Sequence, residues 1–191
     1  GVITEVRHVK EYRFAVVMRG QDLHPEILDT DPQHTGVPPH PATAHLPIAE
    51  STAALFNQWI AKADQVLAGH QKANGLTLRG FSTDPSLPTF KDSYGLNAAA
   101  ISVYPMYKGV ASLVGMQVIQ FQGETPEDEF TALKNVWDDH DFFFIHIKKT
   151  DSYGEDGNFE AKVKEIEAVD AEIPRILALK PGALIVTGDH S

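Results

Sequence analysis

The sequence predicts an α/β fold, in which the strands of a parallel sheet alternate with helices. Three apolar runs, at 98–103, 142–147 and 182–186, have the length of strands that are buried on both faces of such a sheet. Between them lie stretches with apolar residues at helical spacing, of which 158–179 is the longest. Because this alternation is typical of βαβ units, we expect a parallel sheet in the second half of the chain.

The composition excludes several classes of partner. The chain has 191 residues and is 42% hydrophobic, so it can bury the core of one domain or of two small ones. A formal net charge of -10, from 26 acidic and 16 basic residues, argues against nucleic acid and anionic membranes as partners. No apolar run approaches the roughly 20 residues of a membrane-spanning helix, and no secretory signal is visible. The absence of Cys fits a cytoplasmic protein, which is the location we expect.

The first half of the chain begins with a charged segment and then a predicted strand at 12–19, in which apolar and other residues alternate. Arg13 and Arg19 are six positions apart in it, so they lie on the same face, about 20 Å from each other. From the pattern alone, these two arginines are either exposed charges or ligands of a small anion.

A stretch with two prolines at 82–91 has no periodicity and marks a domain boundary, which predicts domains at 1–85 and 86–191. The rest of the first domain is expected to contain a proline-rich loop at 21–47, a helix at 48–70 and a short strand at 76–80 that includes Arg79. The second domain is expected to contain strands at 98–103, 116–121, 142–147 and 182–186, and helices at 107–115, 126–138 and 158–179.

Acidic residues follow two of the predicted strands. Asp151 comes after the run at 142–147, and Asp189 and His190 come after the run at 182–186. In open α/β sheets ligands bind beyond the carboxyl ends of the strands, so these side chains are candidates for one metal or phosphate site. Glu155, four residues after Asp151, adds a further carboxylate. The alternative is that each Asp caps the turn or helix that follows it.

Without Cys, the available metal ligands are oxygen and imidazole nitrogen, a combination that suits Mn²⁺, Zn²⁺ or Mg²⁺. The last predicted strand is followed directly by these candidate ligands and by Ser191, so we expect the chain to be part of a longer protein.

Several segments of the sequence resemble those of a known family. The Thr-Gly-Asp-His-Ser run at 187–191 and the Asp-Gly-Asn-Phe-Glu run at 156–160 are its most specific motifs. Further similarities, in the same order along the chain, lie at 11–20, 29–32, 87–90, 94–96, 108–111 and 115–116. Together they resemble the archaeal-type 2,3-bisphosphoglycerate-independent phosphoglycerate mutases of the alkaline phosphatase superfamily.

The resemblance implies an inserted α/β substrate domain at 1–85 and, at 86–191, part of an alkaline-phosphatase-like parallel-sheet domain that binds metal. The implied reaction interconverts 3-phosphoglycerate and 2-phosphoglycerate, in glycolysis and gluconeogenesis, through a phosphoserine. The implied cofactors are two divalent metal ions, with Mn²⁺ favoured over Zn²⁺, Co²⁺ and Mg²⁺, and the implied partner is a small phosphorylated carboxylate.

The resemblance also assigns roles to single residues. Its implied substrate ligands are Arg13, Arg19, Arg79 and Lys91, and its implied metal ligands are Asp151, Glu155, Asp189 and His190. Two of these depart from the family pattern: Glu155 stands where a His is common, and Lys91 substitutes for a Lys expected where Ser93 stands. The nucleophilic serine is expected outside this chain, so the chain alone is expected not to turn over substrate.

Two alternatives remain open. A phosphate-ester hydrolase or another phosphomutase of the same superfamily would use the same metals with a different substrate. The other alternative, from a different class, is a non-catalytic binding module. The oligomeric state is not predicted.

Overall fold

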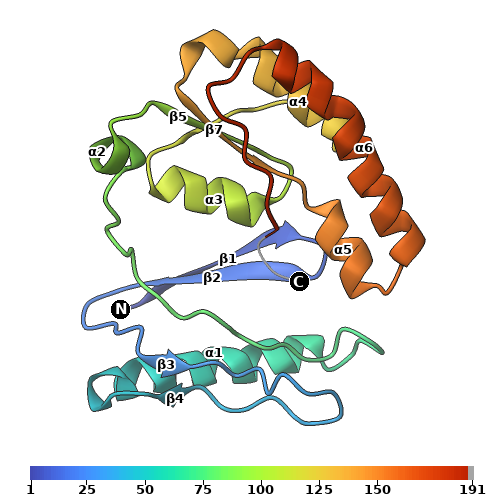
Figure 1. Cartoon of the computed structure of the whole chain (residues 1–191). Coiled ribbons are helices and arrows are strands. Elements are labelled where there is room, and N and C mark those ends of the chain that lie inside the picture. The colour runs from blue at the N-terminus through green and yellow to red at the C-terminus, as the bar shows by residue number, and fades with distance from the viewer. Residues whose placement is uncertain (189–191) are drawn as a thin grey trace. The chain divides into compact units, whose positions relative to one another are not determined.

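The computed structural model describes residues 1–188 and divides the chain into two compact units, Gly1–Pro85 and Ser86–Ser191 (Figure 1). Each unit has its own cluster of buried apolar side chains. None of the helices within residues 1–188 combines the length and the apolar character that a membrane span needs. The roles predicted for 1–85 and 86–191 stay predictions.

The first unit begins with an antiparallel hairpin of β1 (Ile3–Lys10) and β2 (Arg13–Arg19). β2 has a half-buried apolar face, and the ring of Phe14 on that face lies 6.3 Å from the ring of Trp59 in α1 (Glu50–Leu67). The strand predicted at 12–19 and the helix predicted at 48–70 are confirmed. β1 was not predicted, because its charged residues hide the alternation that marks a strand.

The remainder of the first unit packs against α1. Two short strands, β3 (Ile27–Leu28) and β4 (Thr43–Ala44), pair antiparallel, and a short 3₁₀ helix, η1 (Pro47–Ala49), leads into α1. The buried cluster of this unit consists of Ile27, Ala42, Ala49 and Ala53, with Phe56, Ile60 and Phe81 packed against it.

The strand predicted at 76–80 is wrong. Its backbone groups bond mostly to side chains, because the N–H of Leu78 donates to Thr30 Oγ1 at 2.7 Å and the N–H of Gly80 donates to Asp29 Oδ1 at 2.8 Å. One backbone bond, from the N–H of Thr30 to the C=O of Leu78, completes the contact. A hydroxyl and a carboxylate thus take the place of the backbone groups of a partner strand.

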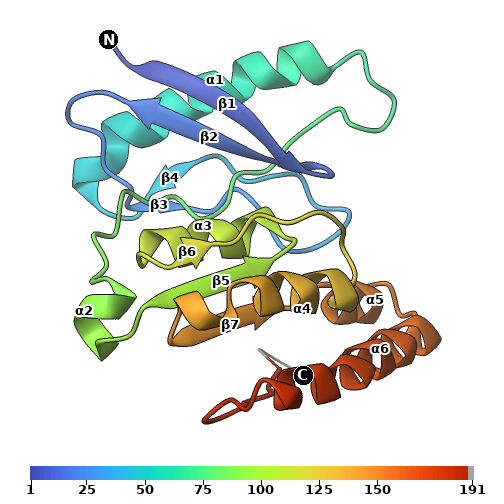
Figure 2. The ribbon, with the colours of Figure 1, turned by 90° about the horizontal axis from the view of Figure 1, so that it is seen from above.

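The second unit contains a parallel sheet in the strand order β6-β5-β7, which confirms the predicted α/β class (Figure 2). Its strands are β5 (Ala98–Ser102), β6 (Gln117–Val118) and β7 (Phe142–His146). All five residues of the central β5 are buried, and four of them are apolar, so other elements cover both of its faces.

Helices precede, connect and follow these strands. They are α2 (Phe90–Tyr94), α3 (Pro105–Leu113), α4 (Pro126–Asn135) with the 3₁₀ helix η2 (Trp137–Asp139), α5 (Lys149–Glu155) and α6 (Phe159–Ala178). The three helices predicted in this half are confirmed. α2 and α5 were not predicted, because neither has an apolar stripe long enough to be recognised.

α4 begins with a capping box that fixes its direction. Thr125 Oγ1 accepts a hydrogen bond from the N–H of Asp128 at 3.2 Å, and Asp128 Oδ2 accepts one from the N–H of Thr125 at 3.0 Å. Gly123 precedes the box with φ of +98°, and a β-carbon there would collide with the Asp128 carboxylate. A glycine is therefore required at this turn.

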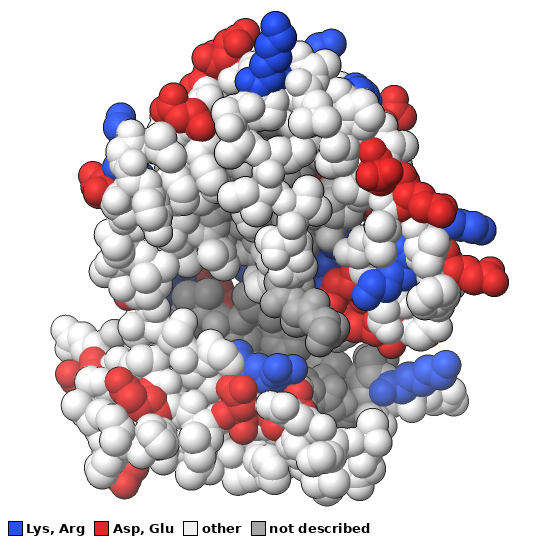
Figure 3. Space-filling model, viewed as in Figure 1, with Lys and Arg blue, Asp and Glu red and all other residues white. Residues whose placement is uncertain are grey.

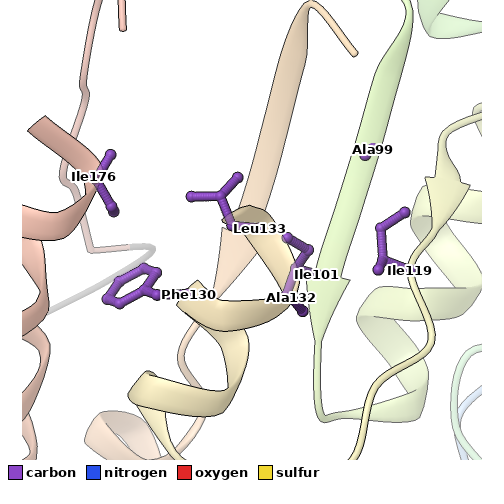
Figure 4. Packing of buried hydrophobic residues seen from close by; sticks show 7 residues of the cluster. All are labelled: Ala99, Ile101, Ile119, Phe130, Ala132, Leu133 and Ile176. Carbon is purple, nitrogen blue, oxygen red and sulfur yellow. The ribbon is translucent and has the colours of Figure 1, made fainter. Parts of the chain in front are cut away.

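The core of the second unit lies between the sheet, α4 and α6. Figure 4 shows Phe130 and Leu133 of α4 between Ile176 of α6 and Ile101 of β5. Leu133 is 1% exposed and Ile101 is fully buried. The amino-terminal half of α6 takes less part in this core, since Phe159 and Ile166 remain exposed.

The strand predicted at 182–186 is wrong for the described part of the chain. Residues 183–188 form no strand and pair with none of the three strands, and Ile185 and Val186 are exposed. An apolar run shows that burial would be favourable, but a strand also requires a backbone partner in register, which this run does not have among residues 1–188.

We expect Leu133→Ala to lower the free energy of unfolding of the second unit by about 2–5 kcal/mol, because the change leaves a cavity in a closed core. Urea denaturation followed by circular dichroism measures this. The same change at Leu113, which is 51% exposed on α3, is the control and should cost less than about 1 kcal/mol. Equal losses in both variants would contradict the placement of the core.

Candidate metal and substrate-binding site

Asp151 lies at the carboxyl end of the parallel sheet. β7 ends at His146, and Asp151 stands in the first turn of α5, where the helix dipole favours a negative charge. Its carboxylate forms an ion pair with Lys148, the residue that precedes α5, and the two side chains are only 19% and 16% exposed. A carboxylate thus lies at the strand end where the sequence placed one, next to a cation that was not predicted.

Glu155 lies one helical turn after Asp151, on the same side of α5, and is exposed. Both acids act on Lys148. Burial alone would lower the pKa of its ammonium, but the hydrogen bond and charge of Asp151 outweigh burial, and the charge of Glu155 adds to them, so the pKa of Lys148 is raised. The structure therefore brings Asp151 and Glu155 together around one positive charge.

The chemistry of these two side chains fits a hard divalent cation, because carboxylate oxygens are its preferred ligands. Asp189 and His190 lie outside the described residues. Within residues 1–188, no three His, Asp or Glu side chains converge as a metal ion would require. The metal roles of Asp151, Glu155, Asp189 and His190 stay predictions.

Two tyrosines that the sequence analysis did not select stand at the same edge of the sheet. Tyr104 follows β5 and is 6% exposed, and the Lys148 Nζ lies 5.5 Å from its ring centroid. Tyr107 stacks on His146 with a centroid distance of 3.3 Å. The position of both tyrosines just after the run at 98–103 was the signal that could have identified them.

The arginines assigned to substrate lie in the first unit and each has an acidic partner. Arg13 pairs with Glu11 at 3.0 Å, and Arg19 with Glu5 at 2.6 Å. Arg13 and Arg19 share the face of β2 that points away from Trp59, but they lie at opposite ends of the strand. The structure places them on one face without bringing them together.

Arg79 and Lys91 are less constrained. Arg79 lies 3.5 Å from Asp31, and its side chain is 61% exposed. Lys91 lies on the short helix α2 of the second unit, where its side chain is exposed and forms no hydrogen bond or ion pair with a described residue. Their roles, like those of Arg13 and Arg19, stay predictions.

Figure 3 shows Lys and Arg side chains interspersed with Asp and Glu side chains on the face in view.

Glu129 is an unusual acid in the first turn of α4. It is 1% exposed, and its Oε2 has no hydrogen-bond partner among residues 1–188. Burial, helped by the charge of Glu165, raises the pKa of Glu129 to about 8, although Lys108 and Lys149 act in the opposite direction. A carboxyl group that stays protonated at neutral pH is therefore part of the α4 packing. Nothing in the sequence distinguishes Glu129, because it is one of three acids in this turn.

Comparison with known proteins identifies close relatives. A family model described as the metalloenzyme superfamily matches residues 17–191. The chain is 49% identical, over 195 residues, to the probable 2,3-bisphosphoglycerate-independent phosphoglycerate mutase of Aquifex aeolicus, covering 100% of this chain and 48% of the relative. The protein of that name from Deinococcus radiodurans is 48% identical over 196 residues, again covering 100% of this chain and 48% of the relative. The resemblance drawn from the motifs is confirmed.

Two solved structures are also similar to this chain. The cofactor-independent phosphoglycerate mutase of Thermoplasma acidophilum is similar with a TM-score of 0.59 and 25% identity, over 93% of this chain and 50% of that one. The PH0037 protein of Pyrococcus horikoshii is similar with a TM-score of 0.57 and 27% identity, over 69% of this chain and 39% of that one. The chain spans about half the length of the relatives that it matches.

We expect the free energy of unfolding to fall as the pH rises from about 4.5 to about 8, because Glu129 ionises in the unfolded chain before it ionises in the folded one. The slope from this group is at most about 1.4 kcal/mol per pH unit. Glu129→Gln should flatten it, since Gln cannot ionise. Urea denaturation at a series of pH values measures the slope.

The control for this experiment is Glu127→Gln, an exposed acid in the same turn, which should leave the slope as it is. If Glu129→Gln keeps the slope of the unchanged protein, Glu129 is not the buried neutral acid described here.

Proposed function

The chain belongs to the metalloenzyme superfamily, and from this we propose that it forms the substrate-binding unit and part of the metal-binding unit of a 2,3-bisphosphoglycerate-independent phosphoglycerate mutase. The observation that carries the proposal is the match of the whole chain, at 48–49% identity, to relatives of that name. The position of Asp151 at the carboxyl end of β7 supports it, because ligands of α/β sheets bind at that edge.

The proposed reaction interconverts 3-phosphoglycerate and 2-phosphoglycerate, a step of glycolysis and gluconeogenesis. The phosphoryl group passes from one hydroxyl of the substrate to a serine that we place outside this chain, and it returns to the neighbouring hydroxyl. One phosphate ester bond is broken and one is formed in each half of the reaction. Water must be kept from the phosphoserine, since water would convert transfer into hydrolysis.

We assign the metal to Asp151, Glu155, Asp189 and His190. Two divalent ions are proposed, with Mn²⁺ favoured over Zn²⁺, Co²⁺ and Mg²⁺, because three carboxylates and one imidazole form a mainly hard set of ligands. When bound, the ions supply positive charge that stabilises the transferring phosphoryl group. We further propose a cytoplasmic location, with neither nucleic acid nor membrane as partner.

We propose that Arg13, Arg19 and Arg79 bind the carboxylate and phosphate of the substrate, and that Lys91 is a further substrate ligand. A guanidinium binds such groups through two parallel hydrogen bonds. The present partners of the arginines are carboxylates that are exposed or half-buried, and the arginine side chains are themselves at least 39% exposed, so each ion pair is close to solvent and contributes at most about 1 kcal/mol. A substrate can therefore replace these partners at small cost.

We expect Arg13→Met and Arg19→Met each to raise the KM for 3-phosphoglycerate by about 10- to 100-fold, because each removes a charged hydrogen bond to substrate. Steady-state kinetics on the complete gene product that contains this chain measures it. The matched control is Arg7→Met on the same face of the hairpin, where Arg7 is 76% exposed and lies 3.4 Å from Glu5. An equal rise in all three variants would point to a general loss of charge and contradict the assignment.

The activity is tested by incubating the complete gene product with 3-phosphoglycerate and Mn²⁺, without 2,3-bisphosphoglycerate. We expect 2-phosphoglycerate to form and EDTA to abolish its formation. Free phosphate without isomerisation would instead identify a hydrolase of the same superfamily. The absence of both products from metal-loaded protein would contradict the proposed substrate.

A further inference from the structure

The ion pair between Lys148 and Asp151 is more enclosed than the ion pairs of the first unit. Its two side chains are 16% and 19% exposed, whereas those of Arg13 and Glu11 are 39% and 55% exposed. Enclosed charges are screened less by water and salt, so this pair has a larger electrostatic effect than a surface pair. It also occupies a carboxylate that the proposed function assigns to a metal.

Lys148 is held in place by several contacts. Its backbone is fixed as the residue that precedes α5, three positions before Asp151. Its Nζ lies 5.5 Å from the ring centroid of the buried Tyr104, which favours a cation there. The charge of Glu155 acts on it as well. The ammonium is therefore a fixed positive charge among the acids of α5 and is not a mobile surface lysine.

A fixed ammonium and a divalent cation compete for the same carboxylate. An oxygen that accepts a hydrogen bond from Lys148 donates less electron density to a metal, and two positive charges a few ångströms apart repel each other strongly in a partly enclosed site. Metal binding at Asp151 thus requires the Lys148 ammonium to give up its contact or to tolerate a cation beside it.

We infer that Lys148 is a positioning residue of the metal site, which neutralises Asp151 before metal binds and lowers the affinity of the site for divalent cations. This inference rests on the proposed function, since it takes Asp151 as a metal ligand. It assigns to Lys148 a role opposite to that of a ligand: removal of the side chain's charge strengthens metal binding.

The test is the dissociation constant for Mn²⁺ alone, measured on the complete gene product by the electron paramagnetic resonance signal of free Mn²⁺. Lys148→Met should bind Mn²⁺ about 10-fold more tightly, because a competing charge is gone. Lys148→Gln should behave in the same way. Lys148→Arg, which keeps the charge, should stay within about threefold of the unchanged protein.

The matched control is Lys149→Met, which removes the same charge one residue away. Lys149 forms no ion pair with a described residue, so this variant should change the dissociation constant by less than about threefold. Thermal melting of each variant, followed by circular dichroism, shows whether it is folded. Two substitutions at 148 are used so that the failure of one to fold does not end the test.

Asp151→Asn separates the possible failures. If Asp151→Asn leaves Mn²⁺ binding unchanged, the proposed metal site is wrong, and the role inferred for Lys148 is wrong as well. If Asp151→Asn weakens binding while Lys148→Met and Lys148→Gln do not strengthen it, the metal site stands and the role of Lys148 is overturned. Tighter binding in both neutral variants, restored to the original value by Lys148→Arg, supports the inference.

Discussion

The parallel pairing of β5 with β6 and β7 is the constraint on which the second unit depends. Because the strands run in one direction, the residues that follow β5 and those that follow β7 emerge at the same edge of the sheet. Tyr104 and Asp151 are distant in the sequence, yet Lys148 contacts both. Because all five residues of β5 are buried, this central strand is held in place. The edge of the sheet at which Lys148 and Asp151 lie is held in place with it.

Two acids of the second unit are neutralised in different ways. Glu129 is closed off by α4 packing and keeps its proton, whereas Asp151 keeps its charge and is paired with Lys148. The first arrangement suits a group that remains inside the core. The second suits a group that exchanges partners, because one cation can replace another at a carboxylate that is already ionised. The difference supports a binding role for Asp151 and a structural role for Glu129.

The sequence was most informative where an apolar pattern and a local signal agreed. The runs at 98–103 and 142–147 became β5 and β7, and Asn158 caps α6 by accepting a hydrogen bond from the N–H of Ala161. Where the pattern depended on a distant partner it failed. The run at 76–80 bonds to side chains of another loop, and the run at 182–186 has no strand partner among the described residues.

The same distinction holds for the site. The position of Asp151 at a strand end followed from the order of apolar and acidic residues along the chain. The ion pair of Asp151 with Lys148 and the approach of Lys148 to the Tyr104 ring could not be predicted, because both depend on side-chain conformation and on which strands are neighbours.

The most direct measurement is a crystal structure of the complete gene product grown with Mn²⁺, with an anomalous difference map that locates the metal. The account predicts an anomalous peak about 2.2 Å from a carboxylate oxygen of Asp151, at the carboxyl edge of the sheet. Manganese bound only elsewhere, with Asp151 still paired to Lys148, would contradict it.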